Sequence, residues 1–476
     1  MADPHVVILG AGPAGVGAAY KLRRRGLARV TVIEQQSTVG GNAGSFEAGG
    51  QRLDYGSHRL HPACDPEILR DIRSLLGNDL LDRPRHGRIR LRGKWIHFPL
   101  KPLDLLLRLD RRFAAGTALD ITTRKTRRHR SDSGEDSFAS VLMASLGRTI
   151  CEEFYFPYAR KIWGREPEEL SGIQARRRVS AGSFGKLMRK VLSQIPGLNQ
   201  RGAGRFFYPR NGYGEISEAY ADAARNLGAE FLLEAKVTAL QLGGGIGGRG
   251  WTVSVDQKGR LLSLDPDYVW STIPITLLTR LVCPAPEARV LEAASSMEYR
   301  AMLLIYLELD EDRFTEYDAH YFPGADIRIT RLSEPKNYSL NGQPGRTTLC
   351  AELPCSPDDH WWKMSDYELG TIVAEDLARA GLPLRRNPVA VHAKRLRHAY
   401  PVYTNGYEKP FGILESWVEG LPNLLSYGRQ GLFAHDNTHH ALFMAYSAAD
   451  CLTDGVFDHA KWEDYRRNFA THVVED

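Results

Sequence analysis

Several features of specialised proteins are missing from this sequence of 476 residues. No apolar run approaches the roughly 18 residues that a membrane-spanning helix needs. No basic and apolar leader precedes "HVVILG", the first predicted strand. The six cysteines are scattered and include no CxxC pair, which argues against a dithiol redox site and against a secreted disulfide framework. These absences predict a protein of the reducing cytoplasm without a transmembrane segment.

Charge is balanced, which removes another class of function. The net charge of +5 gives no support to nucleic-acid binding. Basic residues gather in "TTRKTRRHRSDSGEDS" (122–137), which we interpret as a solvated loop, with attraction of a phosphate-bearing substrate as the alternative. The stretch "LDLLLRL" (103–109) indicates a buried helix face, with peripheral contact to a membrane surface as the alternative.

What is present begins with a strand, a glycine turn, a helix and a second strand. "HVVILG" leads into "GAGPAG", "VGAAYKLRRRG" has a helical composition, and "ARVTVIE" is again strand-like. Gly10, Gly12 and Gly15 have the G-x-G-x-x-G spacing, which permits a tight turn, close approach of a pyrophosphate and close helix–strand packing. Glu34 ends the second strand, where a carboxylate accepts hydrogen bonds from a ribose hydroxyl. We therefore predict a dinucleotide-binding βαβ unit.

Context separates this glycine motif from a second copy of the same spacing. Gly243, Gly245 and Gly248 are followed by "WTVSV", a strand, so we interpret them as a hairpin loop. After Glu34, the stretch "QQSTVGGNAGSF" contains Gly40 and Gly41 in a loop that lets the main chain approach a flat ring or a phosphate. Among common dinucleotides, FAD has the length to need both approaches. FAD is thus the predicted cofactor.

The remaining pattern predicts further layers. Residues 63 to 205 have a mostly helical composition. Alternation returns in "AEFLLEAKVTALQL" and "GWTVSVD", and then in "YVWSTIP", "RAMLLIYLELD", "DAHYFPG" and "TTLCAELP", which favour an antiparallel sheet that walls a substrate cavity. The last 60 residues return to a strand, "NLLSYG", and a small-residue helix, "HHALFMAYSAADCL".

A set of motifs resembles one FAD-dependent superfamily. The motifs are "GAGPAG", "GGNAGS", "LDYGSHRLHP", "RKIWGREPEELS", "FFYPRNGYGEISEAYADAARNLGAEFLLEAKVTAL", "AYPVY" and "GRQGLF". They are similar to those of protoporphyrinogen oxidase, amine oxidases, phytoene desaturases and UDP-galactopyranose mutase. The resemblance implies an α/β fold with a discontinuous Rossmann-like FAD-binding domain, a helical insertion and an antiparallel-sheet substrate domain. The expected boundaries are 1–62, 206–276 and 415–476 for the FAD-binding parts, 63–205 for the helical domain and 277–414 for the substrate domain.

The resemblance also implies which residues contact the cofactor. It places Gly10, Gly12, Pro13, Ala14 and Gly15 at the pyrophosphate, Glu34 and Gln35 at the adenosine ribose, Gly40, Gly41 and Asn42 along the flavin side, the backbone of Val237 at the adenine edge, and Gly428 and Arg429 at the pyrophosphate and ribityl chain. The final helix, capped by Asn437 or Thr438, is expected to point its positive end at the flavin pyrimidine ring.

The histidines around this helix suggest a metal site as an alternative. His435 and His439 would share one face if the helix began early enough. We disfavour this interpretation for His435, His439 and His440, because no carboxylate or thiolate set accompanies them and surface or capping histidines explain them. No metal is predicted.

Candidate catalytic and substrate residues follow from the same resemblance. His58 and His61 are expected near the isoalloxazine, where one of them can move a proton or orient a ligand; a structural role is the alternative for His61. Arg300 is the basic residue nearest to the position where amine oxidases of the superfamily usually carry a lysine. The expected substrate-cavity residues are Tyr158, Arg160, Trp163, Tyr208, Tyr321, Tyr400 and Tyr403.

The predicted function is oxidation of a small organic substrate, by hydride transfer to flavin N5, in specialised or envelope metabolism. The missing lysine argues against amine oxidation with direct use of oxygen. The alternative is a non-redox nucleotide-sugar mutase, which "YGSHRLHP" and "KIWGREPEELS" resemble. His435 and Asn437 stand where that mutase usually has a tyrosine and an aspartate, which argues against its usual sugar-diphosphate recognition. A third interpretation is a flavin-binding scaffold without catalysis.

Overall fold

A parallel five-stranded sheet forms the first layer of this computed structural model, which describes residues 3–98, 113, 116, 120, 136–178, 204–243, 250–340 and 342–474. Its order is β20-β13-β1-β2-β9. The strands are β1 (His5–Leu9), β2 (Arg29–Ile33), β9 (Glu230–Leu232), β13 (Tyr268–Ser271) and β20 (Leu424–Ser426). The sheet therefore joins segments from the beginning, the middle and the end of the chain.

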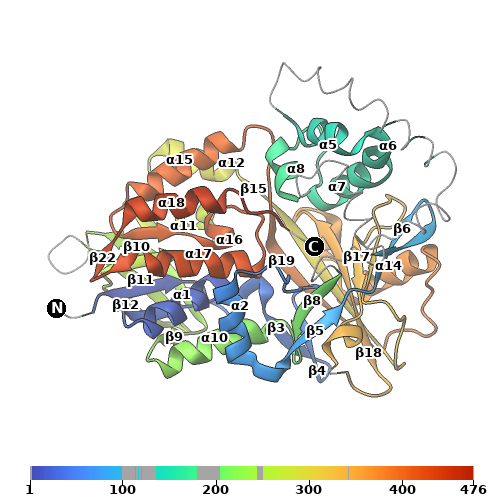
Figure 1. Cartoon of the computed structure of the whole chain (residues 1–476), viewed down its shortest axis with the longest axis horizontal. Helices are drawn as coiled ribbons and strands as arrows, with labels where there is room; N and C mark the ends of the chain where they lie inside the picture. The colour runs from blue at the N-terminus through green and yellow to red at the C-terminus, as the bar shows by residue number, and fades with distance from the viewer. Residues whose placement is uncertain are drawn as a thin grey trace.

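Successive side chains of β1 point to opposite faces of this sheet, and both faces are buried. Val6 and Ile8 belong to the core that the helices share, and Val7 and Leu9 to the core shared with a second sheet. The helices include α1 (Pro13–Arg24), α10 (Glu215–Asn226) and α17 (Thr438–Asp450). The second sheet contains β10 (Ala235–Leu242), β11 (Trp251–Gln257), β12 (Arg260–Leu264) and β14 (Val282–Cys283). Figure 1 shows blue α1 and red α17 side by side, although they come from opposite ends of the chain.

A mixed seven-stranded sheet forms the other half of the molecule. Leu303 and Ile305 pack on the side covered by α14 (Asp366–Arg379), and Leu304 and Tyr306 pack with Leu53 on the opposite side. The sheet order is β19 (Ala390–Val402), β15 (Glu298–Leu309), β18 (Thr347–Cys355), β17 (Arg331–Ser333), β16 (Ala319–Tyr321), β6 (Gly87–Leu91) and β7 (Lys94–Phe98). This is the predicted substrate-domain sheet, and the predicted α/β fold class is confirmed.

Part of the expected helical stretch is strand. Helices α2 (Pro66–Leu76), α5 (Phe138–Leu146), α7 (Phe156–Trp163) and α8 (Gly172–Arg178) do form, and α5, α7 and α8 stand together in Figure 1. Between α2 and α5, however, β5 (Leu80–Pro84) pairs with β8 (Arg205–Pro209), and β6 and β7 extend the seven-stranded sheet. The prediction was wrong here because the helical interpretation of the whole stretch overlooked "GRIRL", in which basic residues alternate with buried ones at the period of two that indicates a strand.

The partner of "YVWS" was also predicted wrongly. We expected this segment in the antiparallel sheet, but β13 runs parallel between β1 and β20. Val269 and Trp270 are both buried, as expected of a strand covered on both faces. An apolar run of this kind does not indicate which strand lies beside it, so the sequence did not predict the pairing. The hairpin around Gly243 is confirmed, since Leu242 and Trp251 pair across β10 and β11.

Some sequence features lie outside the described residues. They are 103–109, residues 122–135 of the charged loop, and Gly245 and Gly248 of the second glycine motif. In the described part of the chain, no helix has both the length and the apolar character that crossing a bilayer requires.

Candidate functional site

The turn between β1 and α1 is shaped by three glycines with different constraints. Gly10 has φ +96°, and a Cβ there would lie 2.7 Å from Thr272 Oγ1. A Cβ on Gly15 would lie 1.9 Å from the carbonyl oxygen of Gly10, so α1 packs too closely on the turn for any side chain. Gly12 has an ordinary φ of −69°, and its Cβ would meet no described atom within 4 Å. Space therefore exists in front of Gly12, at the helix N-terminus, where amide groups attract an anion.

Glu34 ties the second strand to this turn. One carboxylate oxygen accepts a hydrogen bond from Ala11 N at 2.9 Å, and the other accepts one from Gln36 N at 2.9 Å. Burial raises the pKa of Glu34, although these amide hydrogen bonds oppose the rise. A carboxylate has about four acceptor positions, so Glu34 retains capacity for ribose hydroxyls. Gln35, also predicted at the ribose, is exposed.

The second glycine loop lies directly against the first. Gly40 has φ +109°, and its N–H donates to the carbonyl of Ala11 at 2.8 Å. A Cβ on Gly41 would lie 3.4 Å from the Cα of Gly12. Asn42 then donates from Nδ2 to the carbonyl of His398 on β19 at 3.1 Å. The two loops thus form one surface, and Asn42 joins that surface to the seven-stranded sheet.

The end of the chain completes the same surface. Gly428 has φ +79°, and a Cβ there would lie 2.8 Å from the Cβ of Ala14. Arg429 donates from Nη2 to the carbonyl of Ala399 at 2.7 Å, and its guanidinium lies 5.1 Å from the centre of the Tyr400 ring. Asn437 is the N-cap of α17, and its N–H donates to His440 Nδ1 at 3.2 Å. Thr438 is the first helical residue.

Val237 lies on β10, two residues after Ala235, whose N–H donates to the carbonyl of Glu34 at 2.9 Å. Its backbone stands where the register of the β10–β11 pair shifts between Val237 and Ala239. Its side chain is half-buried. Its contact with the adenine edge stays a prediction, as do the other individual cofactor contacts.

His58 is held by a backbone hydrogen bond and by a ring contact. Its Nε2 lies 2.8 Å from the carbonyl of Tyr55, so Nε2 carries the proton and Nδ1 the lone pair. Its ring stacks on Tyr213 with centres 5.1 Å apart. Burial lowers the pKa of His58, against an opposing effect of Asp54. A neutral imidazole follows at neutral pH, which suits a proton acceptor.

Asp54 and Tyr213 are neighbours of His58 that the sequence interpretation missed. Asp54 Oδ1 accepts from Ser45 Oγ at 2.6 Å and from Tyr213 N at 2.8 Å, and its Oδ2 accepts from the hydroxyl of Tyr208. Burial raises the pKa of Asp54 despite these donors. The aspartate precedes "YGSH" directly, so its position in that motif was the available signal.

The other two predicted catalytic residues lie in separate places. His61 Nδ1 accepts from Ala63 N at 3.1 Å, and His61 interacts electrostatically with His439. Arg300, on β15, donates to the carbonyl of Pro354 at 3.3 Å, and a Cβ on Gly164 would lie 2.8 Å from its guanidinium. Burial lowers the pKa of Arg300. His61 therefore stands with the C-terminal helix and Arg300 with the end of α7.

Three of the predicted substrate residues surround one histidine. The ring of His435 lies 4.8 Å from that of Trp163, 4.7 Å from that of Tyr403 and 6.4 Å from that of Tyr400, and Trp163 and Tyr400 form an edge contact at 5.6 Å. The hydroxyl of Tyr403 donates to the carbonyl of Phe433 at 2.7 Å. The other four have separate partners: Tyr321 accepts a hydrogen bond from Arg59 at 3.1 Å, Tyr208 is buried on Asp54, Tyr158 lies against Phe154, and Arg160 forms an ion pair with Glu166 at 2.7 Å in which both side chains are about half exposed. Substrate contact by any of them stays a prediction.

Two arginines near Tyr321 were not anticipated. Arg59 is buried 3.4 Å from Asp318 and lies over the ring of Phe206. Arg331 is buried against Glu352 at 2.6 Å, and the two arginines repel each other electrostatically. Among the described atoms, Nε of each arginine has no hydrogen-bond partner. This region therefore holds guanidinium groups with unused donors, and these suit an anionic ligand.

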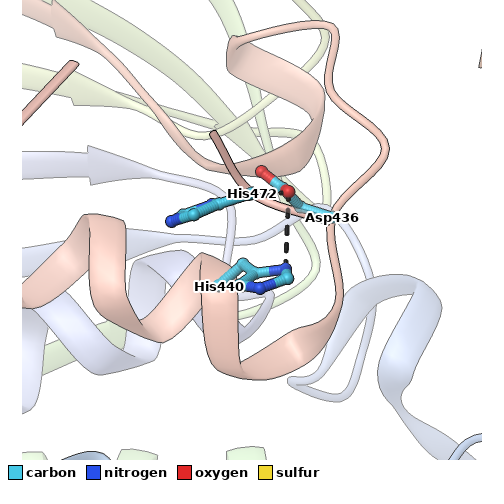
Figure 2. Close-up of side chains that lie close together, drawn as sticks. All are labelled: Asp436, His440 and His472. Carbon is cyan, nitrogen blue, oxygen red and sulfur yellow. Dashed lines mark ion pairs between the residues drawn. The ribbon is translucent and has the colours of Figure 1, made fainter. Parts of the chain in front are cut away.

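The histidine cluster differs from the predicted one. His435 and His439 are buried rather than at the surface, and the His435 ring contacts Trp163 at 4.8 Å. His440 is a capping residue, as expected. A carboxylate does accompany it: Asp436 Oδ1 lies 3.4 Å from Nδ1 of His440 and 3.5 Å from Nδ1 of His472. Figure 2 shows the three side chains together. The sequence interpretation missed this group because His472 is distant along the chain.

Comparisons with known proteins agree with this geometry. Residues 13–433 match the sequence profile of the family described as flavin containing amine oxidoreductase. The chain belongs to this flavin-containing amine oxidoreductase family. It is 22% identical over 465 residues to protoporphyrinogen oxidase 2 of Arabidopsis thaliana, with 89% of each chain covered. The predicted superfamily is therefore confirmed.

Solved structures show the same fold as this amine oxidoreductase family member. A reduced UDP-galactopyranose mutase has a TM-score of 0.82 at 19% identity, covering 100% of this chain and 99% of the other. Putrescine oxidase bound to putrescine has a TM-score of 0.67 at 19% identity, covering 94% and 98%.

FAD is the cofactor of this family member, and the residues of the first turn fit it. The space in front of Gly12 lies at the start of α1, and Glu34 offers acceptors beside it. Gly41 and Gly428 bring two further segments to the same place without side chains. These are the features that a dinucleotide diphosphate requires.

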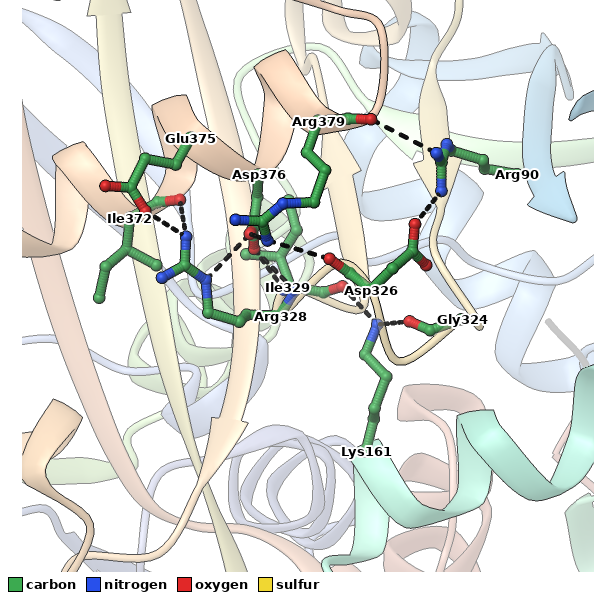
Figure 3. A network of polar contacts seen from close by, with 10 residues as sticks. All are labelled: Arg90, Lys161, Gly324, Asp326, Arg328, Ile329, Ile372, Glu375, Asp376 and Arg379. Atoms are coloured by element: carbon green, nitrogen blue, oxygen red, sulfur yellow. Dashed lines mark hydrogen bonds and ion pairs between the residues drawn. The ribbon is translucent and has the colours of Figure 1, made fainter. Parts of the chain in front are cut away.

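Helix α7, which carries Trp163, is anchored by a buried lysine. Lys161 Nζ donates to the carbonyls of Ile329 at 2.8 Å, Gly324 at 3.2 Å and Phe322. Figure 3 shows Lys161 reaching from α7 to this loop, while Asp376 of α14 accepts from Ile329 N at 3.1 Å. Burial lowers the pKa of Lys161 to about 7. The loop is thus held between the helical insertion and the sheet domain.

Exchange of two glycines should separate cofactor binding from folding. Gly12→Val places its side chain in the space at the helix start, so we expect a folded protein that retains less than about a tenth of its FAD. Gly15→Ala places a Cβ against backbone, so we expect loss of the fold itself. Absorbance of the purified variants and circular dichroism measure the two effects. Full FAD occupancy in folded Gly12→Val would contradict the assignment of the site.

Lys161→Met should change how stability depends on pH. The pKa of this lysine is lower in the folded chain than the usual value near 10.4, so the unfolded chain binds more protons between about pH 7 and 10. The free energy of unfolding of the natural protein should therefore rise relative to the variant over that range, by at most about 1.4 kcal/mol per pH unit. Urea unfolding at several pH values measures it, with the exposed Lys363→Met as control. If the free energy of unfolding changes with pH in the same way in all three proteins, Lys161 does not cause the pH dependence.

Proposed function

We propose that this chain is an FAD-dependent oxidoreductase that removes a hydride from a small organic substrate. The observation that carries the proposal is the family match over residues 13–433, and His58, which follows the second glycine loop in the chain, supports it. FAD, when bound, supplies the hydride acceptor.

The chain's own residues would position the substrate and handle the proton. When an alcohol gives up a hydride from carbon, its hydroxyl must also lose a proton, and an amine loses one from nitrogen to give a neutral imine. His58 Nδ1 can accept that proton, because Nε2 already donates to the carbonyl of Tyr55. Trp163 and Tyr400, in edge contact at 5.6 Å, would supply an apolar wall.

A nucleotide-sugar mutase is the second candidate, and two observations support it. The mutase structure covers 100% of this chain at a TM-score of 0.82, compared with 94% and 0.67 for putrescine oxidase. Arg59 and Arg331 carry buried guanidinium atoms without hydrogen-bond partners among the described residues, and such atoms suit a diphosphate. In that chemistry the overall reaction transfers no electrons to an acceptor.

Anaerobic spectroscopy distinguishes the two functions. We expect an amine, an alcohol or a reduced polycyclic compound to bleach the oxidised flavin without any added reductant. If instead no such compound bleaches the flavin, and a nucleotide sugar isomerises only after chemical reduction of the protein, the mutase is correct. The screen should contain both substrate classes.

His58→Asn tests the proton acceptor. An amide keeps a hydrogen-bonding group of similar reach but cannot take up a proton at neutral pH, so we expect substrate-driven flavin reduction to slow by about a hundredfold or more. FAD content should stay the same. The exposed His360→Asn is the control for loss of an imidazole. Stopped-flow absorbance gives the rate, and an unchanged rate would remove His58 from the reaction.

A further inference from the structure

The C-terminal segment brings a histidine to the start of α17. Asp436 lies in the turn before α17, His440 in its first turn, and His472 in the segment that follows α18 (His459–Phe469). Figure 2 shows the three side chains converging from two separate parts of the chain. We propose that Asp436, His440 and His472 bind a divalent transition-metal ion of the zinc type.

The spacing of the three groups fits a metal. The distances from Asp436 Oδ1 are 3.4 Å to His440 Nδ1 and 3.5 Å to His472 Nδ1, and one ligand atom from each of the three residues lies within 4.8 Å of the others. Tetrahedral zinc with ligands at about 2.0–2.1 Å separates the ligand atoms by roughly 3.3–3.4 Å. Two of the distances between ligand atoms therefore already match those of coordination, although the rings must still turn before their lone pairs point at one metal ion.

Asp436 offers a buried carboxylate at this position. The residue is 3% exposed, and beyond the nitrogen of His472 at 3.5 Å neither carboxylate oxygen has a hydrogen-bond donor among the described residues. His440 Nδ1 accepts the N–H of Asn437 at 3.2 Å with its single lone pair, so metal binding through this atom requires that hydrogen bond to be given up. Arg177 also acts electrostatically on Asp436, and a metal ion would add to the positive charge that stabilises this buried anion.

The ligand types select the kind of metal. Two imidazoles and one carboxylate are a common donor set for zinc, whereas magnesium and calcium favour all-oxygen sites. Three protein ligands leave one position for water. The site joins the last segment of the chain to the N-terminus of α17, so we assign the metal a structural role in holding this segment in place.

Coordination requires two rearrangements, and the first is that His440 Nδ1 releases the N–H of Asn437. The rings of His440 and His472 are stacked, with centres 4.2 Å apart and planes 16° apart. Nitrogen lone pairs lie in the ring planes, so those of parallel rings do not meet at one point. The ring of His472 must turn out of the stack when the metal binds. This change distinguishes a metal site from a pair of histidines that share a proton with Asp436.

Metal titration of the full chain with its FAD tests the proposal. The protein is stripped with a chelator and titrated with Zn²⁺ by calorimetry and with Co²⁺ by visible absorption. We expect one equivalent bound, ligand-field bands of tetrahedral Co²⁺, and a higher melting temperature with Zn²⁺. Metal binding is read without any assay of activity, so the result does not depend on the proposed function.

Variants identify the ligands. His472→Ala should weaken Zn²⁺ binding by roughly a hundredfold or more, because one of three ligands is lost, and should abolish the tetrahedral Co²⁺ bands. Exposed His459→Ala, in the same part of the chain, should bind as the natural protein does. Asp436→Asn is a second ligand variant; if it does not fold, His472→Ala decides alone. Absence of one-equivalent binding, or binding unchanged in His472→Ala, would overturn the proposal.

Discussion

Close packing of α1 against α17 is the constraint on which the cofactor site depends. A Cβ on Gly17 would lie 2.7 Å from Leu442 Cδ2 and 3.2 Å from Ala445 Cβ, so these helices approach as only small residues allow. Gly428 meets Ala14 in the same way. The approach brings the last part of the chain to the glycine turn of the first. A surface for one dinucleotide then consists of segments more than 400 residues apart in the sequence.

Buried polar groups fix the segment that carries His58. Asp54 is held by donors from Ser45, Tyr208 and Tyr213 rather than by an opposite charge. Three residues later, Ser57 N donates to Glu352 at 3.0 Å, and Glu352 also pairs with Arg331. The two anchored residues thus lie just before His58 in the chain. Such anchoring pre-organises a reacting group, because reorganisation is not needed when charge moves.

Features that depend on residues close together in the sequence were predicted correctly. The first βαβ unit, the final helix with Asn437 as its cap, and the superfamily were confirmed, because glycine spacing, strand composition and capping residues are all local signals. Strands β6 and β7 were missed although basic residues alternate with buried ones in β6, because the two strands are short and lie within a stretch of mostly helical composition. The parallel pairing of β13 was missed, because its partners lie far along the chain.

The same limit applies to the site. Tertiary packing determines the roles of three residues that local pattern did not reveal. It brings Arg59 near Asp318, Arg331 near Glu352 and His472 near Asp436. Sequence spacing also suggested that His435 and His439 belong together. Instead, the ring of His435 packs on Trp163, and His472 lies beside Asp436.

The central claim is that both ends of the chain enclose one FAD. The most direct measurement is to unfold the purified yellow protein and to quantify the released nucleotide by chromatography. This account predicts one FAD per chain. Release of FMN or NAD instead, or a folded protein that takes up no FAD on reconstitution, would contradict it.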